Sequence, residues 1–190
     1  MKLKNLVLKL TKEPNLTKKK LEKLKRQWSK TNGFMPKNSQ ILADYKTLIK
    51  EKKIKKNKLI EKTLRLKKIR SLSGIVPIAV LTKPYRCPGQ CVYCPTQKGI
   101  PKSYLDDEPA VMRAKMADFD PYLQVKRRIT QLEQTGHSTE KIELIVMGGT
   151  FSALPSAYQK KFIKKCFEAA NSFYGKKSFG SLGIPSTRTS

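Results

Sequence analysis

The chain has 190 residues, of which 38% are hydrophobic, and its 41 lysines and arginines outnumber 14 acidic residues to give a formal net charge of +27 at pH 7. Because so strong a positive field attracts polyanions, we expect RNA, DNA or an anionic membrane surface as the partner, with a merely solvated lysine-rich surface as the alternative. No stretch approaches the roughly 20 consecutive apolar residues of a membrane span, and the N-terminus lacks a signal-peptide cleavage site, which argues against an integral membrane or secreted protein.

The first 72 residues are predicted to form a basic helical region. Residues 1–70 carry 24 basic and 5 acidic side chains, and apolar residues recur there at helical spacing. Three helices are expected: one between Pro14 and Asn32, one from about Ser39, and one over about residues 58–70. Their apolar stripes are Leu21, Leu24 and Trp28; Ile41, Leu42, Tyr45, Leu48 and Ile49; and Leu59, Ile60, Leu64 and Ile69.

Each of these helices is expected to carry a cationic face opposite its apolar stripe. Such a face suits RNA phosphates, which basic side chains bind without reading the base sequence. Lys52, Lys53, Lys55 and Lys56 are the predicted RNA-backbone contacts. A helical subdomain that only packs its apolar stripes is the simpler interpretation, and both can hold together.

The composition changes near Ser73-Gly74, and residues 73–182 are predicted to form an α/β domain. A short apolar run over residues 75–81 suits a buried parallel strand, with Pro77 at an edge or at the strand start. A polar loop that contains the cysteines is expected to follow, from residue 82 to about residue 113.

Three further elements complete this predicted domain: a helix opened by Asp120-Pro121, a strand over residues 142–147, and a helix from Pro155. The residues expected to face inward are Tyr122, Val125, Ile129 and Leu132 on the first helix, and Tyr158, Phe162, Cys166 and Phe167 on the second. The order strand, helix, strand, helix predicts a parallel α/β sheet, open or barrel-like. Two strands make neither a barrel nor a stable sheet, so the sequence is expected to end inside a larger domain.

Three of the four cysteines, Cys87, Cys91 and Cys94, lie within eight residues at C-x3-C-x2-C spacing. Clustered thiols without a secretion signal indicate a metal site in a reducing cytosol rather than a disulfide framework. A structural zinc would need a fourth ligand, but His137 is far along the chain and Cys166 is on the apolar side of a helix. Three thiolates suit a 4Fe–4S cluster with one open iron, and zinc remains the alternative.

Short sequence blocks around the cysteines resemble a known family. The aromatic residue directly before Cys94 is similar to the signature of radical S-adenosylmethionine enzymes. The wider blocks are Ser71-Leu72-Ser73-Gly74, Leu81-Thr82-Lys83-Pro84-Tyr85-Arg86-Cys87-Pro88, Pro101-Lys102-Ser103-Tyr104, Glu108-Pro109-Ala110, Met112-Arg113-Ala114, Phe119-Asp120-Pro121-Tyr122, Gly136-His137-Ser138, Lys141-Ile142-Glu143 and Met147-Gly148-Gly149-Thr150-Phe151. In this order they resemble the catalytic subunit of Elongator, the tRNA carboxymethyluridine synthase family, in its single-chain prokaryotic form.

The resemblance implies a basic tRNA-binding N-terminal region, a partial (β/α) TIM-like radical S-adenosylmethionine domain and a C-terminal acetyltransferase domain. The implied activity attaches an acetyl-derived group to C5 of the wobble uridine of tRNA, with S-adenosylmethionine and acetyl-CoA as co-substrates. Cys87, Cys91 and Cys94 match the ligands of the 4Fe–4S cluster. The resemblance assigns Gly148, Gly149 and Thr150 to S-adenosylmethionine and Lys141 to acetyl-CoA; it names no catalytic residue.

Some features depart from the family. No acetyltransferase domain is recognisable, and residues 183–190 form an irregular tail, so a truncated or frame-shifted gene is expected and the polypeptide could be inactive alone. The rival interpretations are a different radical S-adenosylmethionine enzyme and a non-catalytic RNA-binding iron–sulfur fragment. No protein partner is predicted.

Four other residues near these motifs also receive predictions. Lys83 and Arg86 flank the cysteines, where they could meet phosphate or carboxylate or balance an anionic cluster. His137 is expected at a helix end or turn rather than as a general base, and Cys166 as a buried core thiol.

Overall fold

The computed structural model of the chain describes residues 2–173 and residue 175; the tail predicted at 183–190 lies outside the described residues. The chain divides into two compact units, which are described separately. The first comprises Met1–Val76 with Thr130–Lys141, and the second comprises Pro77–Ile129 with the chain from Ile142 onward. The domain limits expected from the sequence, 1–72 and 73–182, stay a prediction.

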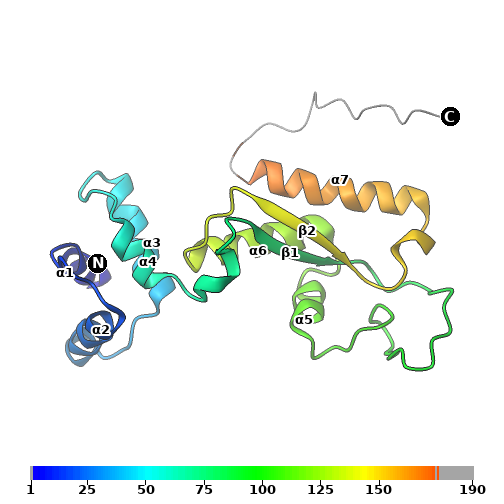
Figure 1. Cartoon of the computed structure of the whole chain (residues 1–190), viewed down its shortest axis with the longest axis horizontal. Helices are drawn as coiled ribbons and strands as arrows, with labels where there is room; N and C mark the ends of the chain where they lie inside the picture. The colour runs from blue at the N-terminus through cyan, green and yellow to red at the C-terminus, as the bar shows by residue number, and fades with distance from the viewer. Residues whose placement is uncertain (1, 174, 176–190) are drawn as a thin grey trace. The chain divides into compact units, whose positions relative to one another are not determined.

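The first unit is helical and is built around one apolar core. Its elements are α1 (Lys2–Thr11), α2 (Lys18–Asn32), α3 (Asn38–Lys50), α4 (Lys58–Leu64) and the 3-10 turn η1 (Lys68–Ser71) (Figure 1). α1 packs against α2 and α3, and α3 packs against α4. The buried core residues are Leu6, Val7, Leu10, Leu16, Leu21, Trp28, Ile41, Leu42, Tyr45, Leu48, Ile60 and Leu64.

Side-chain and glycine caps explain where two of these helices begin or end. The Thr17 hydroxyl accepts a hydrogen bond from the backbone N–H of Lys20 at 3.2 Å and so begins α2. α2 ends at Gly33, whose φ of +78° is a left-handed conformation that glycine adopts at no steric cost. The Asn57 amide oxygen accepts from Leu59 N at 2.9 Å at the start of α4.

Most of the apolar residues predicted for this unit are buried in its core or packed against it, but Leu59 is exposed, and two helix boundaries differ from the prediction. The second helix begins at Asn38, one residue before the expected start near Ser39, and Lys37 is its N-cap. The third helix ends at Leu64 because Arg65 is extended, and Ile69 lies on the turn η1 with 86% of its surface exposed. α1 was not predicted.

The second unit contains a two-stranded parallel sheet, so the expected α/β class is confirmed at this level. β1 (Val76–Leu81) pairs with β2 (Ile142–Met147), since Val76 N donates to Lys141 O at 3.0 Å and Thr82 N donates to Met147 O at 2.9 Å. Both bonds advance six residues along each strand, which fixes the parallel direction. Pro77 is exposed, and its backbone nitrogen is on the side of β1 that does not pair with β2. The missing N–H of proline therefore removes no hydrogen bond between the strands.

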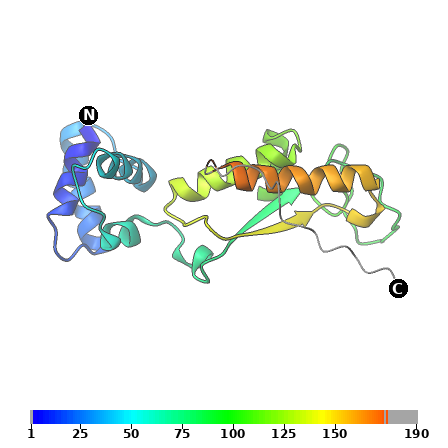
Figure 2. The same ribbon diagram turned by 90° about the horizontal axis from the view of Figure 1, so that it is seen from above.

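Helices α5 (Pro109–Met116), α6 (Pro121–Gln134) and α7 (Ser156–Ser172) and the short turn η2 (Phe151–Ala153) accompany the sheet. α7 lies alongside the strands in Figure 1 and in the view from above in Figure 2. The Asp120 carboxylate accepts from Leu123 N at 2.7 Å, which confirms the predicted opening of α6. Among the described residues, no helix is both long and apolar enough to cross a membrane.

Two expectations for this unit are wrong. The polar loop ends at Glu108 rather than near Arg113, because Pro109 begins α5 in the position that proline favours. Phe167 was expected inward but has 51% of its surface exposed. Adjacent residues of a helix point about 100° apart. Because Cys166 points into the core, the side chain of Phe167 points outward.

Candidate functional site

The cysteine loop directly follows β1 and contains three of the four thiols. Cys94 N donates to Cys91 O at 3.2 Å, which closes a turn between these two cysteines. A Cβ atom built on Gly89 would lie 3.7 Å from the Sγ atoms of both Cys87 and Cys91, so these two thiols flank the glycine. Among the described residues, no three His, Cys, Asp or Glu side chains gather closely enough to hold a single metal ion.

Two hydroxyl groups contact the sulfur atoms of this loop. Cys87 Sγ lies 3.5 Å from Thr150 Oγ1, and Cys94 Sγ lies 3.0 Å from Ser103 Oγ. Hydrogen bonding by Thr150, and then by the Gly89 backbone, lowers the pKa of the Cys87 thiol. A lowered pKa favours the thiolate, which is the form that binds metal, so Cys87 suits a metal ligand. Three clustered thiols are a donor set that fits an iron–sulfur cluster.

Cys166 differs from the loop cysteines in its burial. It lies on α7 with 1% of its surface exposed, and burial, together with the nearby charge of Asp120, raises the pKa of its thiol to about 12. A neutral, buried thiol is a core side chain rather than a ligand, which confirms the prediction for Cys166.

The glycines after β2 have a structural reason to be glycines. Gly148 has φ +143°, and a Cβ atom there would collide with the hydroxyl of Thr82, a buried residue at the end of β1. A Cβ atom on Gly149 would lie 3.7 Å from Cys87 Cβ. The two glycines therefore let the end of β2 approach the end of β1 and the cysteine loop.

These residues together line a small hollow at the ends of the two strands. It has a volume of about 10 Å³ and is lined by Thr82, Lys83, Tyr85, Arg86, Cys87, Pro101, Gly149, Thr150 and Leu154. Ligand sites usually enclose about 300–1,000 Å³, so the described residues supply only part of such a site. The structure thus brings together Cys87, Gly149 and Thr150 from the sequence-predicted set.

Lys83 is held against α7 beside this hollow. Its backbone N–H donates to Tyr158 Oη at 3.1 Å, and its Nζ lies 4.9 Å from the centre of the Tyr158 ring. This cation–π contact directs the Lys83 charge toward the ring. Arg86, like Lys83, is exposed. A role for either residue toward a ligand stays a prediction.

Lys141 belongs to the first compact unit, whereas the cysteines belong to the second. Its side chain is exposed, and its carbonyl accepts the Val76 N–H at the start of the strand pair. Its contact with acetyl-CoA stays a prediction. His137 is buried, with Nδ1 2.7 Å from Ser71 Oγ, and directly follows the left-handed Gly136 after α6, as its predicted turn position requires.

The four lysines predicted to contact RNA occupy the turn between α3 and α4, where all are exposed. Lys53 Nζ lies 2.9 Å from Glu51 Oε2, and Lys56 Nζ lies 4.0 Å from Glu61 Oε1. Hydrogen bonds from Lys4 and Lys53 lower the pKa of Glu51 to about 2. Two of the four predicted cations therefore already face a carboxylate.

A second cationic surface lies on α2, and sequence reasoning did not single it out. It consists of Lys19, Lys23, Arg26 and Lys30, all of which are exposed. Their spacing of four, three and four residues places them on one face of the helix. We call them the α2 stripe. Within the part of the chain that the structure describes, none of the four forms an ion pair, whereas Lys20 pairs with Glu13 and Lys25 with Glu22. The 3.6-residue periodicity of charge could have revealed it.

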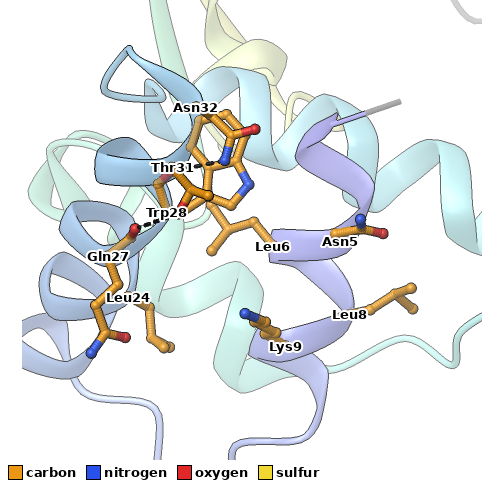
Figure 3. A pocket seen from close by; sticks show the side chains of 9 residues that line it. All are labelled: Asn5, Leu6, Leu8, Lys9, Leu24, Gln27, Trp28, Thr31 and Asn32. Carbon is orange, nitrogen blue, oxygen red and sulfur yellow. Dashed lines mark hydrogen bonds between the residues drawn. The ribbon is translucent and has the colours of Figure 1, made fainter.

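The first unit also has a groove between α1 and α2. It encloses about 550 Å³, and its lining residues are Asn5, Leu6, Leu8, Lys9, Leu24, Gln27, Trp28, Thr31 and Asn32 (Figure 3). Asn32 Nδ2 donates to the Trp28 carbonyl at 2.8 Å, and Trp28 is 8% exposed. None of the sequence-predicted site residues lines this groove.

Comparison with known proteins identifies the relatives of this chain. No family profile matches it. A tRNA uridine(34) acetyltransferase of Methanocaldococcus jannaschii is 46% identical over 165 residues, which cover 82% of this chain and 29% of that protein. The protein of the same name from Dehalococcoides mccartyi is 49% identical over 102 residues, covering 54% of this chain and 22% of that protein. Human Elongator complex protein 3 is 46% identical over 126 residues, covering 59% and 22%.

This chain belongs to the family of the tRNA uridine(34) acetyltransferases and Elongator complex protein 3. The resemblance inferred from the sequence blocks is thereby confirmed. The chain spans less than a third of the length of these relatives.

Proposed function

We propose that this chain forms the RNA-binding region and the first part of the radical S-adenosylmethionine domain of an enzyme that modifies uridine 34 of tRNA. The names of its relatives support the substrate, and the observation that carries the chemistry is the loop of three thiols directly after β1. Two consecutive β/α units with parallel strands are the repeating element of a (β/α) barrel, which supports the partial TIM-like fold.

In this proposal Cys87, Cys91 and Cys94 hold a 4Fe–4S cluster, and S-adenosylmethionine is the cofactor. Delivery of an electron to S-adenosylmethionine is the chemistry that such a cluster supplies when bound. Three thiolates leave one iron without a cysteine, which suits an open position for a ligand. The cysteine loop is anchored on both sides, because Thr150 contacts Cys87 and Ser103 contacts Cys94.

Residues at the end of β2 are suited to receive S-adenosylmethionine. Gly149 is exposed beside Cys87, and its lack of a side chain leaves backbone groups accessible to a polar ligand. We assign Gly148, Gly149 and Thr150 to this cofactor. Gly148 is also needed for packing, because a side chain there would collide with Thr82. Acetyl-CoA is the proposed acyl donor, and Lys141, an exposed cation, is its proposed contact.

The first unit supplies the proposed tRNA-binding surface. The α2 stripe and the lysines between α3 and α4 are exposed cations on a rigid helical core, so they can meet phosphates without a folding cost. Phosphate contacts position an RNA but carry little sequence information. Recognition of the modified base therefore belongs to the second unit and to the remainder of the enzyme.

Anaerobic reconstitution of the whole chain with iron and sulfide tests the cysteine assignment. We expect an oxygen-sensitive brown protein with about four irons per chain. Alanine at Cys87, Cys91 or Cys94 should abolish the colour, and Cys166→Ala is the matched control that should keep it. Stoichiometric zinc with no iron uptake would overturn the assignment.

A further inference from the structure

Two of the three loop thiols face hydroxyl groups, one from Ser103 later in the same loop and one from Thr150 after β2. Ser103 Oγ lies 3.0 Å from Cys94 Sγ, and Thr150 Oγ1 lies 3.5 Å from Cys87 Sγ. Both distances suit hydrogen bonds to sulfur. Cys91 is exposed, and in the described part of the chain it has no such hydroxyl partner. The loop is therefore asymmetric, with two sulfurs bonded and one free to face outward.

The backbone of Ser103 indicates that its position is imposed. Its φ is +79°, a left-handed conformation that residues other than glycine seldom adopt. In this conformation Ser103 N donates to Pro95 O at 3.2 Å while its hydroxyl contacts Cys94. One residue thus holds two consecutive positions of the cysteine loop. Strained conformations of this kind concentrate at functional sites.

Thr150 reaches Cys87 by a different route. It is the third residue after β2, and Gly148 and Gly149 allow this segment to lie against Thr82 and the Cys87 side chain. Ser103 and Thr150 are 47 residues apart in the sequence, yet both present a hydroxyl to a cysteine sulfur. Two independent segments converge on the same kind of contact.

The direction of these hydrogen bonds follows from the chemistry of a metal-bound thiolate. A sulfur bound to iron has no proton, so it can only accept, and the hydroxyl must donate. Donation stabilises negative charge on sulfur, and this charge increases when a cluster is reduced. Hydrogen bonds to the sulfurs are among the factors that set the potential of iron–sulfur clusters.

We propose that Ser103 and Thr150 are positioning residues that donate hydrogen bonds to the cluster sulfurs of Cys94 and Cys87 and so raise the reduction potential of the cluster. The proposal rests on the proposed function, in which these cysteines hold the cluster.

Variants of the full chain separate the hydroxyl from the rest of each side chain. Thr150→Val removes the hydroxyl at nearly constant shape, and Thr150→Ser retains it. Ser103→Gly removes the hydroxyl and suits the left-handed φ. The matched control is Thr96→Val, because Thr96 Oγ1 is in the same loop but contacts the Cys94 carbonyl at 3.5 Å rather than a sulfur. Each protein is reconstituted anaerobically, its iron counted, and its midpoint potential determined by redox titration followed by electron paramagnetic resonance.

We expect lower midpoint potentials in Thr150→Val and Ser103→Gly, a still lower one in the double variant, and unchanged potentials in Thr150→Ser and Thr96→Val. Unchanged potentials in the first two variants at full iron content would overturn the inference alone. A further outcome is that Thr150→Val folds, as judged by circular dichroism, and yet takes up no iron. In that case, iron uptake by Thr150→Ser would support the inference, and failure of Thr150→Ser to take up iron would overturn it. Absence of iron from the unsubstituted chain would overturn the proposed function itself.

Discussion

The two units place their informative residues in opposite kinds of structure. In the first, the cations of the α2 stripe stand on a regular helix whose apolar side joins the core, and position along the helix determines which side chains share a face. In the second, the site residues lie on residues 82–108, which contain no helix or strand, and at the end of β2. Their arrangement depends on contacts between segments distant in sequence, such as Gly148 with Thr82.

This difference implies that the two surfaces respond differently to substitution. A helical cation can be replaced without disturbing its neighbours, because the core beneath it is independent of the charge. A residue at the strand ends acts through close packing, so even one added methyl group must displace another segment.

The core of the first unit should be sensitive where α4 ends. Leu64, the last residue of α4, is fully buried, whereas Ile69 on the following turn is 86% exposed. Leu64→Ala should lower the free energy of unfolding by about 3–5 kcal/mol, through lost burial and a cavity. Ile69→Ala, the matched control, should change it by less than about 0.5 kcal/mol. Urea denaturation followed by circular dichroism measures both; similar losses would mean that the third helix continues to Ile69.

The α2 stripe should carry more of the RNA affinity than the lysines between α3 and α4. Replacing its four cations by glutamine should weaken tRNA binding about a hundredfold at 100 mM salt and make the slope of log affinity against log salt shallower by about 3, by loss of counterion release. The control replaces Lys52, Lys53, Lys55 and Lys56, which removes the same charge. It should cost less, because Lys53 and Lys56 already face carboxylates. Equal losses in filter-binding titrations would mean that net charge alone decides the affinity.

The strand ends should reject a single methyl group. Gly148→Ala places a Cβ atom against the Thr82 hydroxyl in a conformation that alanine seldom adopts, and should cost about 2 kcal/mol of stability. Adding Thr82→Ala should recover part of this loss. Gly99 also has a positive φ, +77°, but a Cβ atom there would meet no atom within 4 Å, so Gly99→Ala should cost only about 1 kcal/mol. Thermal melts measure the loss of stability in each variant. Equal losses at Gly148 and Gly99 would show that close packing plays no part.

The smallest expected effect is a pH dependence at Glu51. Its pKa falls from 4.5 to about 2 in the folded chain because Lys4 and Lys53 donate to it. Its stabilising contribution is therefore present above pH 4.5 and is lost as the pH falls toward 2. Glu51→Gln should weaken the dependence of Tm on pH between 4.5 and 2. Asp44→Asn, at a carboxylate with no ion pair among the described residues, is the control, and an unaltered pH profile in Glu51→Gln would refute the pairing.

Hydrophobic periodicity predicted the helices and strands best where one apolar face packs on one core. It predicted α2, α3, α6, α7 and both strands within a few residues. It missed α1 although Leu3, Leu6, Val7 and Leu10 have helical spacing, a pattern that was open to detection. It overextended the third helix, because nothing local in Arg65 signals its extended backbone.

The candidate site was predictable in its residue types and not in its contacts. Cysteine spacing and the glycine pair are local patterns and could be recognised directly. The hydroxyl of Ser103, nine residues after Cys94, reaches that sulfur only because its own φ is left-handed, and serine gives no sign of that conformation. Likewise, the need for glycine at position 148 arises from Thr82, a residue far earlier in the chain.

The central claim, that the three cysteines hold a cluster open to S-adenosylmethionine, is tested most directly on the reconstituted and reduced full chain. Addition of S-adenosylmethionine should change the electron paramagnetic resonance spectrum and release deoxyadenosine, and Cys91→Ala should show neither. A chain that contains four irons yet gives an unchanged spectrum and no deoxyadenosine would contradict the account.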